Sequence, residues 1–75
     1  MPTIARIGNI KIQVFADDHN PPHFHVVTPD GEALVSIGHL RILRGDLRRK
    51  DFDAVSEWAN RNLDVIEDAW NSLNG

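Results

Sequence analysis

The sequence contains no cysteine. Disulfide bonds and thiolate metal sites are therefore excluded, and any metal ion would have to be held by histidine and carboxylate side chains. The sequence also has no apolar run of about 18 residues, the length that a membrane-spanning helix needs, and its first residues lack the basic and apolar regions of an export signal. These absences predict a cytoplasmic protein with no membrane contact.

The composition is that of a folded globular chain, because 41% of the 75 residues are hydrophobic and 25% are charged. No repeat, low-complexity tract or linker interrupts the chain, so we expect residues 1–75 to form a single domain. A chain of this length is near the lower limit for folding without a disulfide, a metal or a partner. We therefore expect a homo-oligomer or a complex with a small protein partner.

The first half of the chain shows the two-residue period of β-strands. Ile10, Ile12 and Val14 alternate with more polar positions, and Pro29-Asp30-Gly31-Glu32 is a turn sequence between two apolar segments. Strands are predicted for four segments, residues 10–15, 23–28, 33–37 and 40–43.

The second half changes to helical spacing, with one apolar stripe from Phe52 to Leu73. We expect a break near residues 60–62, where asparagine can cap a second helix. The pattern predicts an α+β fold, a small antiparallel sheet of three or four strands covered by a C-terminal helical segment of one kinked helix or two helices. The predicted core is Ile10, Ile12, Val14, Val35, Ile37, Phe52, Val55, Ala59, Ile66 and Trp70.

The segment from Asp17 to His25 holds three of the four histidines and two aspartates. If His23 and His25 begin a strand, both imidazoles project to one face, with Phe24 on the other. Histidine changes charge near neutral pH, so His23 and His25 would suit acid and base catalysis, as cleavage of RNA requires.

A metal site is a second interpretation of this histidine segment. His19, His23, His25 and Asp18 would supply nitrogen and oxygen ligands for a divalent ion such as zinc. A third interpretation is structural, in which the prolines shape a turn and the imidazoles bond to backbone groups. His39, isolated after Gly38, is predicted to be a surface histidine.

Basic residues concentrate between positions 41 and 50, whereas residues 51–75 hold six acids and one base. This basic segment would bind a phosphate backbone or an acidic protein, so RNA is a candidate partner. The residues that would make these contacts are Arg41, Arg44, Arg48 and Arg49. The alternative is a solvated charged surface. Arg48 and Arg49 precede the predicted helix, where the helix dipole disfavours cations, so local stability does not account for them.

The sequence resembles the bacterial domain-of-unknown-function family 4160 over nearly its whole length. The residues that carry the resemblance are Met1-Pro2-Thr3-Ile4, the block from Asp18 to His25, Glu32-Ala33-Leu34, Gly45 and Leu47, Trp58-Ala59, and Trp70. The resemblance implies a small bacterial protein encoded beside another small domain, in a pair that acts as a toxin-antitoxin-type module. It transfers no catalytic residue, and the family usually has proline where this chain has Arg48.

Three hypotheses of function follow. The first is a component of a two-gene toxin-antitoxin-type module with an RNA-directed or partner-directed surface. The second is a metal-binding domain. The third is a non-catalytic protein-interaction module, in which the helical stripe or a free sheet edge pairs with a partner or a second copy.

Overall fold

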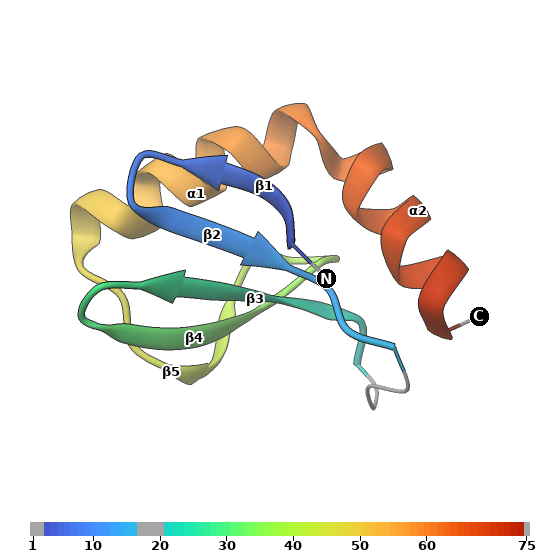
Figure 1. Cartoon of the computed structure of the whole chain (residues 1–75), viewed down its shortest axis with the longest axis horizontal. Coiled ribbons are helices and arrows are strands. Elements are labelled where there is room, and N and C mark those ends of the chain that lie inside the picture. The colour runs from blue at the N-terminus through green and yellow to red at the C-terminus, as the bar shows by residue number, and fades with distance from the viewer. Residues whose placement is uncertain (1–2, 17–20, 75) are drawn as a thin grey trace.

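The computed structural model describes residues 3–16 and 21–74, which fold as five strands followed by two helices (Figure 1). The sheet is antiparallel throughout, with its strands in chain order. Its elements are β1 (Thr3–Ile7), β2 (Ile10–Gln13), β3 (His23–Thr28), β4 (Gly31–Ser36), β5 (Ile42–Gly45), α1 (Arg49–Arg61) and α2 (Leu63–Asn74). The predicted α+β class and C-terminal helices are confirmed.

The expected three or four strands were too few, because β1 was not predicted. This strand forms a hairpin with β2 in which Ile7 pairs with Ile10 across the two residues Gly8 and Asn9. A bulge between Thr3 and Ala5 shifts the register. The bulge adds one residue to β1 and interrupts the alternation of faces. The sequence of this strand therefore lacks the two-residue period that indicates a strand.

The turn between β3 and β4 is tighter than the sequence suggested. Thr28 pairs with Gly31, so only Pro29 and Asp30 form the loop. The Thr28 hydroxyl accepts a hydrogen bond from the Asp30 N–H at 3.2 Å and donates one to the Gly31 carbonyl at 3.1 Å. As a result Glu32, which was predicted to lie in the turn, belongs to β4 and pairs with Val27 of β3.

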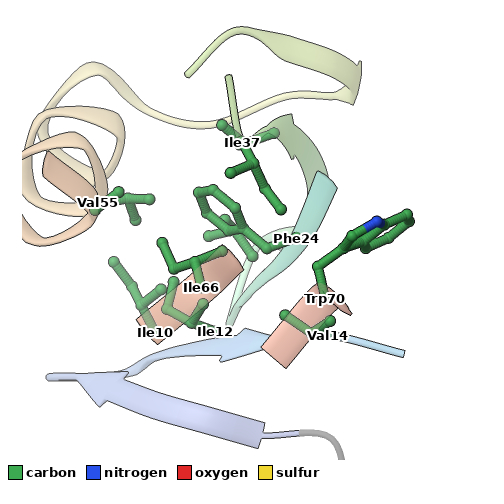
Figure 2. Packing of buried hydrophobic residues seen from close by; sticks show 11 residues of the cluster. Ile10, Ile12, Val14, Phe24, Ile37, Val55, Ile66 and Trp70 are labelled. Carbon is green, nitrogen blue, oxygen red and sulfur yellow. The ribbon is translucent and has the colours of Figure 1, made fainter. Parts of the chain in front are cut away.

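The hydrophobic core lies between one face of the sheet and the two helices (Figure 2). Ile12 pairs with Val26 and Phe24 with Val35, so the apolar positions of β2, β3 and β4 share this face. Nine of the ten predicted core residues are buried: Ile10, Ile12, Val14, Val35, Ile37, Val55, Ala59, Ile66 and Trp70. Each buried Val, Ile or Phe side chain stabilises the fold by about 1.5–3 kcal/mol.

Phe52 is the exception, and its predicted place in the core was wrong. It is only partly buried in the first turn of α1 and lines a groove with Ile42, Leu47 and Arg49. The reason is the position of β5, which is the last strand of the sheet and is exposed at all four residues. Phe52 therefore packs at the margin of the sheet.

Asn62 separates the two helices, as the sequence predicted for residues 60–62. Its side-chain amide donates to the Trp58 carbonyl at 2.8 Å, its N–H donates to the Ala59 carbonyl at 3.1 Å, and its carbonyl accepts from Ile66 at 3.1 Å. The chain turns here, so α2 passes the end of the sheet (Figure 1). Among the described residues, no helix has the length and apolar character needed to cross a membrane.

Candidate functional site

His23 and His25 lie at the start of β3, where strand alternation places both on one face. Their ring centroids are 5.3 Å apart, and Phe24 between them is fully buried in the core. The segment thus has the shared face that its spacing predicted. The two rings nevertheless have different surroundings, and these differences separate their chemistry.

His23 is buried, with 2% of its surface exposed. Its Nδ1–H donates a hydrogen bond to the Pro21 carbonyl at 2.8 Å, and its ring centroid lies 5.3 Å from that of Trp70 in α2. The ring therefore joins the start of β3 to the second helix. Such burial favours packing over contact with a substrate, while the predicted catalytic role of His23 stays a prediction.

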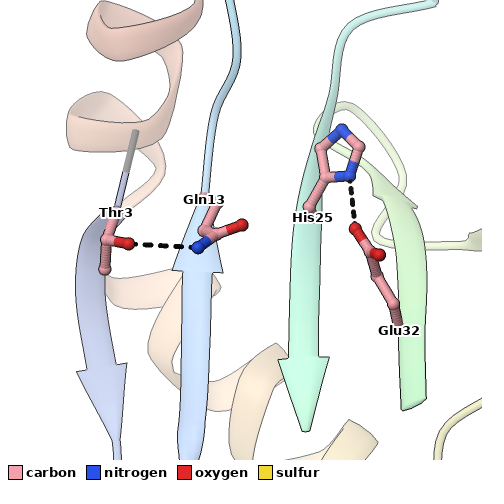
Figure 3. A network of polar contacts seen from close by, with 4 residues as sticks. All are labelled: Thr3, Gln13, His25 and Glu32. Carbon is pink, nitrogen blue, oxygen red and sulfur yellow. Dashed lines mark hydrogen bonds and ion pairs between the residues drawn. The ribbon is translucent and has the colours of Figure 1, made fainter. Parts of the chain in front are cut away.

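His25 is more accessible and forms a hydrogen bond with Glu32 of the adjacent strand (Figure 3). Its Nδ1 and the Glu32 Oε2 atom are 2.9 Å apart, and 15% and 50% of the two side chains are exposed. The Phe15 ring meets the His25 ring nearly edge-on, with centroids 4.5 Å apart. In the neutral ring, an Nδ1–H that donates to this carboxylate leaves the basic lone pair on Nε2.

Sequence reasoning missed Glu32 as a site residue. The signal that could have found it was the tight Pro29-Asp30 turn, which places Glu32 in β4 two residues before Leu34, the direct partner of His25, and therefore on the same face. The sequence analysis assigned four residues to this turn, Pro29 to Glu32, and so did not assign Glu32 to a strand. The pair depends on the hairpin register, because a shift of one residue would send Glu32 to the opposite face.

The face of the sheet opposite the core is here called the open face. The His25–Glu32 pair lies on this face, among basic side chains. Two cross-strand rows form it: Arg6, Lys11, Val27 and Glu32 in one, and Gln13, His25, Leu34 and Arg44 in the other. Gln13 also donates a hydrogen bond to the Thr3 hydroxyl at 3.1 Å (Figure 3). The arrangement places basic side chains on both sides of an imidazole and its carboxylate.

The four predicted phosphate-binding arginines are all exposed but lie on different elements. Arg44 lies in β5 and Arg41 directly before it, whereas Arg49 is the first residue of α1 and Arg48 its N-cap. Arg48 pairs with Asp30 at 3.2 Å and Arg49 with Asp53 at 3.4 Å. Only Arg44 occupies the same cross-strand row as His25.

The predicted metal ligands Asp18 and His19 lie outside the described residues. Within residues 3–16 and 21–74, no group of three or more histidine and carboxylate side chains is placed to hold a metal ion. Zinc binding by His19, His23, His25 and Asp18 stays a prediction.

A hollow of about 500 Å³ lies beside the histidine segment, between the loop that follows β4 and helix α2. Pro22, His39, Glu67 and Trp70 are among its lining residues. His39 is exposed at this position, as the sequence predicted. Trp70 connects the hollow to the buried His23 ring.

A protein-family model described as Domain of unknown function (DUF4160) matches residues 9–71. No curated protein and no solved structure matches the chain significantly.

Proposed function

This chain belongs to the family described as Domain of unknown function (DUF4160), and we propose that it is the RNA-directed component of a two-gene toxin-antitoxin-type module. The observation that carries the proposal is the His25–Glu32 pair on the open face, with Nδ1 and Oε2 2.9 Å apart. In this proposal the open face binds a single RNA strand and His25 moves the proton during cleavage.

The His25–Glu32 pair has the composition of a general base and its positioning group. A carboxylate bonded to one ring nitrogen sets the tautomer and stabilises the imidazolium that forms when the other nitrogen takes a proton. Part of the His25 side chain is exposed, and the Glu32 side chain is half-exposed. His23, which is buried, has no part in the proposed chemistry.

The charge distribution supports contact with phosphate despite the net charge of -3. Six of the eleven acidic residues lie in the two helices and not in the strands. Arg6, Lys11 and Arg44 lie on the open face, where Glu32 is their acidic neighbour. Phosphate contacts of this kind supply most of the affinity for RNA, and Phe15 beside His25 offers a ring against which a base can stack.

The proposed reaction uses the ribose 2′-hydroxyl as the nucleophile. Nε2 of His25 takes the hydroxyl proton, the 2′ oxygen forms a bond to the adjacent phosphorus, and the bond from phosphorus to the 5′ oxygen breaks. The imidazolium then returns its proton to the departing 5′ oxygen, leaving a 2′,3′-cyclic phosphate and a 5′-hydroxyl. Lys11 and Arg44 would stabilise the charge on the phosphoryl oxygens.

The proposal is tested with purified protein and a labelled RNA strand, beside the same sequence with 2′-O-methyl groups. RNA should be cut and the methylated strand should be bound but stay intact. His25→Gln should lower the cleavage rate by about 10²–10⁴-fold, the usual share of a general base, and Glu32→Gln should lower it by a smaller factor. Lys11→Ala and Arg44→Ala should weaken binding and each reduce the salt dependence by about one phosphate contact.

His39→Gln is the matched control, since it removes an exposed histidine outside the open face and should leave cleavage unchanged. Absence of both cleavage and binding in the parent protein would rule out the RNA-directed function. Binding with no cleavage would reduce the proposal to an RNA-binding surface and remove the catalytic role of His25.

A further inference from the structure

We propose that the β5 edge of the sheet binds an extended acidic segment of a partner protein, which pairs with β5 as a sixth strand. The inference does not require RNA cleavage, because it depends on the backbone edge and the surface around it, although Arg44 has a role in both proposals. It names a partner by its chemistry, an apolar anchor residue flanked by carboxylates on an extended chain.

The first argument is the exposure of β5. This strand pairs with β4 alone and forms one margin of the sheet, and all four of its residues are exposed. The outer side of an edge strand presents backbone N–H and C=O groups that another strand can pair with. Two of its side chains are large and apolar, Ile42 at 37% exposure and Leu43 at 46%.

The second argument is charge. No acidic residue occurs from position 33 to position 45, which covers Arg41 and Arg44. Within the described part of the chain neither arginine forms an ion pair, whereas Arg48 and Arg49 each pair with an aspartate. The edge therefore offers two cations that form no ion pair with a carboxylate of the described residues.

The third argument is the groove beside the strand, a hollow of about 380 Å³ lined by Ile42, Leu47, Arg49 and Phe52. Three of these residues are apolar and the fourth supplies a cation at the groove. An apolar side chain of an added strand can enter the groove, and acidic neighbours on that strand can meet the arginines. Backbone pairing then supplies affinity, and the groove and charges supply specificity.

These features select a different protein rather than a second copy of this chain or RNA. Pairing β5 with β5 of a second copy would bring the arginines of the two edges together, and like charges across strands are destabilising. An RNA strand would use the arginines but leave Ile42, Leu43 and the groove uncovered. An acidic peptide satisfies all three features.

The test selects binders from a displayed library of random twelve-residue peptides on the immobilised full chain. Selected peptides should be enriched in Asp and Glu around one apolar residue, and hydrogen exchange should show new protection in β5. The double variant Arg41→Glu/Arg44→Glu should weaken their binding on the order of tenfold or more. Leu43→Thr, at an exposed position, should weaken it without altering the unfolding midpoint.

Arg6→Glu is the matched control, since Arg6 is an exposed cation on β1 at the other margin of the sheet, and peptide affinity should not change. The proposal is overturned if no peptides are selected, if those selected show no acidic bias, or if protection appears away from β5. It is also overturned if a single-stranded RNA protects β5 better than the peptides do, which would make the edge an RNA surface. A homodimer in which the β5 strands of two copies pair would also overturn the proposal, because the edge would then serve self-association.

Discussion

Gly45 shows how one residue determines the position of the edge strand. It ends β5 with φ near +80°, and a methyl group at this position would collide with the backbone of Glu32 and Ala33 on β4. Both the backbone conformation and the close strand approach therefore require glycine. The same contact places β5 beside the strand that carries Glu32.

Gly45→Ala should destabilise the protein by about 1–3 kcal/mol, because a non-glycine residue is strained at this φ and the backbone on β4 must also move. Urea unfolding would measure the loss. Two other glycines distinguish backbone strain from steric collision. Gly8 has φ +58°, whereas the φ of Gly38 is not in the left-handed region. At both positions an added methyl group would meet no atom within 4 Å.

Gly8→Ala should therefore lose stability only through backbone strain, and Gly38→Ala should change it by less than about 0.5 kcal/mol. Equal effects of Gly45→Ala and Gly38→Ala would show that the close approach of β5 to β4 is not present in solution.

At the scale of elements, the Asn62 junction determines where α2 lies. Its three hydrogen bonds end α1 and begin α2 within one residue. The turn brings Trp70 against His23, and the Asn74 amide donates to the Phe15 carbonyl at 2.9 Å. The helix break thus positions Trp70, which packs against His23, and Asn74, which binds the backbone of Phe15 beside the His25 ring.

Asn62→Ala should lower stability by about 0.5–1.5 kcal/mol, the net value of the hydrogen bond to the Trp58 carbonyl. In a domain of this size 1 kcal/mol corresponds to a fall of roughly 4–8 °C in melting temperature. Asn62→Asp keeps the size but cannot donate to the carbonyl, so it should also destabilise. Asn60→Ala, at an exposed position in α1, is the control, and a melting temperature that falls as far for Asn60→Ala would contradict the assigned role of Asn62.

At the scale of the whole molecule, the exposed apolar residues indicate where association would occur. Ile42 and Leu43 are exposed on β5, and Val65 and Leu73 are exposed on α2, at 37–46%. A domain of 75 residues buries little surface on its own. Covering these side chains with a partner or a second copy would add the apolar burial that the isolated chain lacks.

We therefore expect native mass spectrometry to detect species heavier than the 8.5 kDa chain, either from purified protein or from a pull-down with cell extract. Repeating the measurement with a chelator tests the metal hypothesis, because a zinc site would add the mass of the ion and lose it on chelation. His19→Gln is the matched variant. A monomer without bound metal at every concentration, and with no recovered partner, would contradict both expectations.

The amino-acid sequence by itself determined the fold class, the placement of the helices and nine of the ten predicted core residues. These depend on local periodicity, which a single sequence carries: Val55, Ala59 and Ile66 recur at helical spacing, and Ile10 and Ile12 at strand spacing. The shared face of His23 and His25 follows from the same period of two. The break near residues 60–62 was predicted from an asparagine cap on the second helix, whereas the Asn62 side chain donates to the Trp58 carbonyl of the first.

Only the tertiary structure decided what depends on register and on layer packing. The β1 bulge concealed a strand, and the two-residue turn at Pro29-Asp30 brought Glu32 to His25. His23 is more deeply buried than His25, and Trp70 of α2 packs against its ring. Periodicity tells which face a residue occupies, but a partner's identity and a ring's exposure arise from contacts between segments far apart in the chain, and no local pattern contains them.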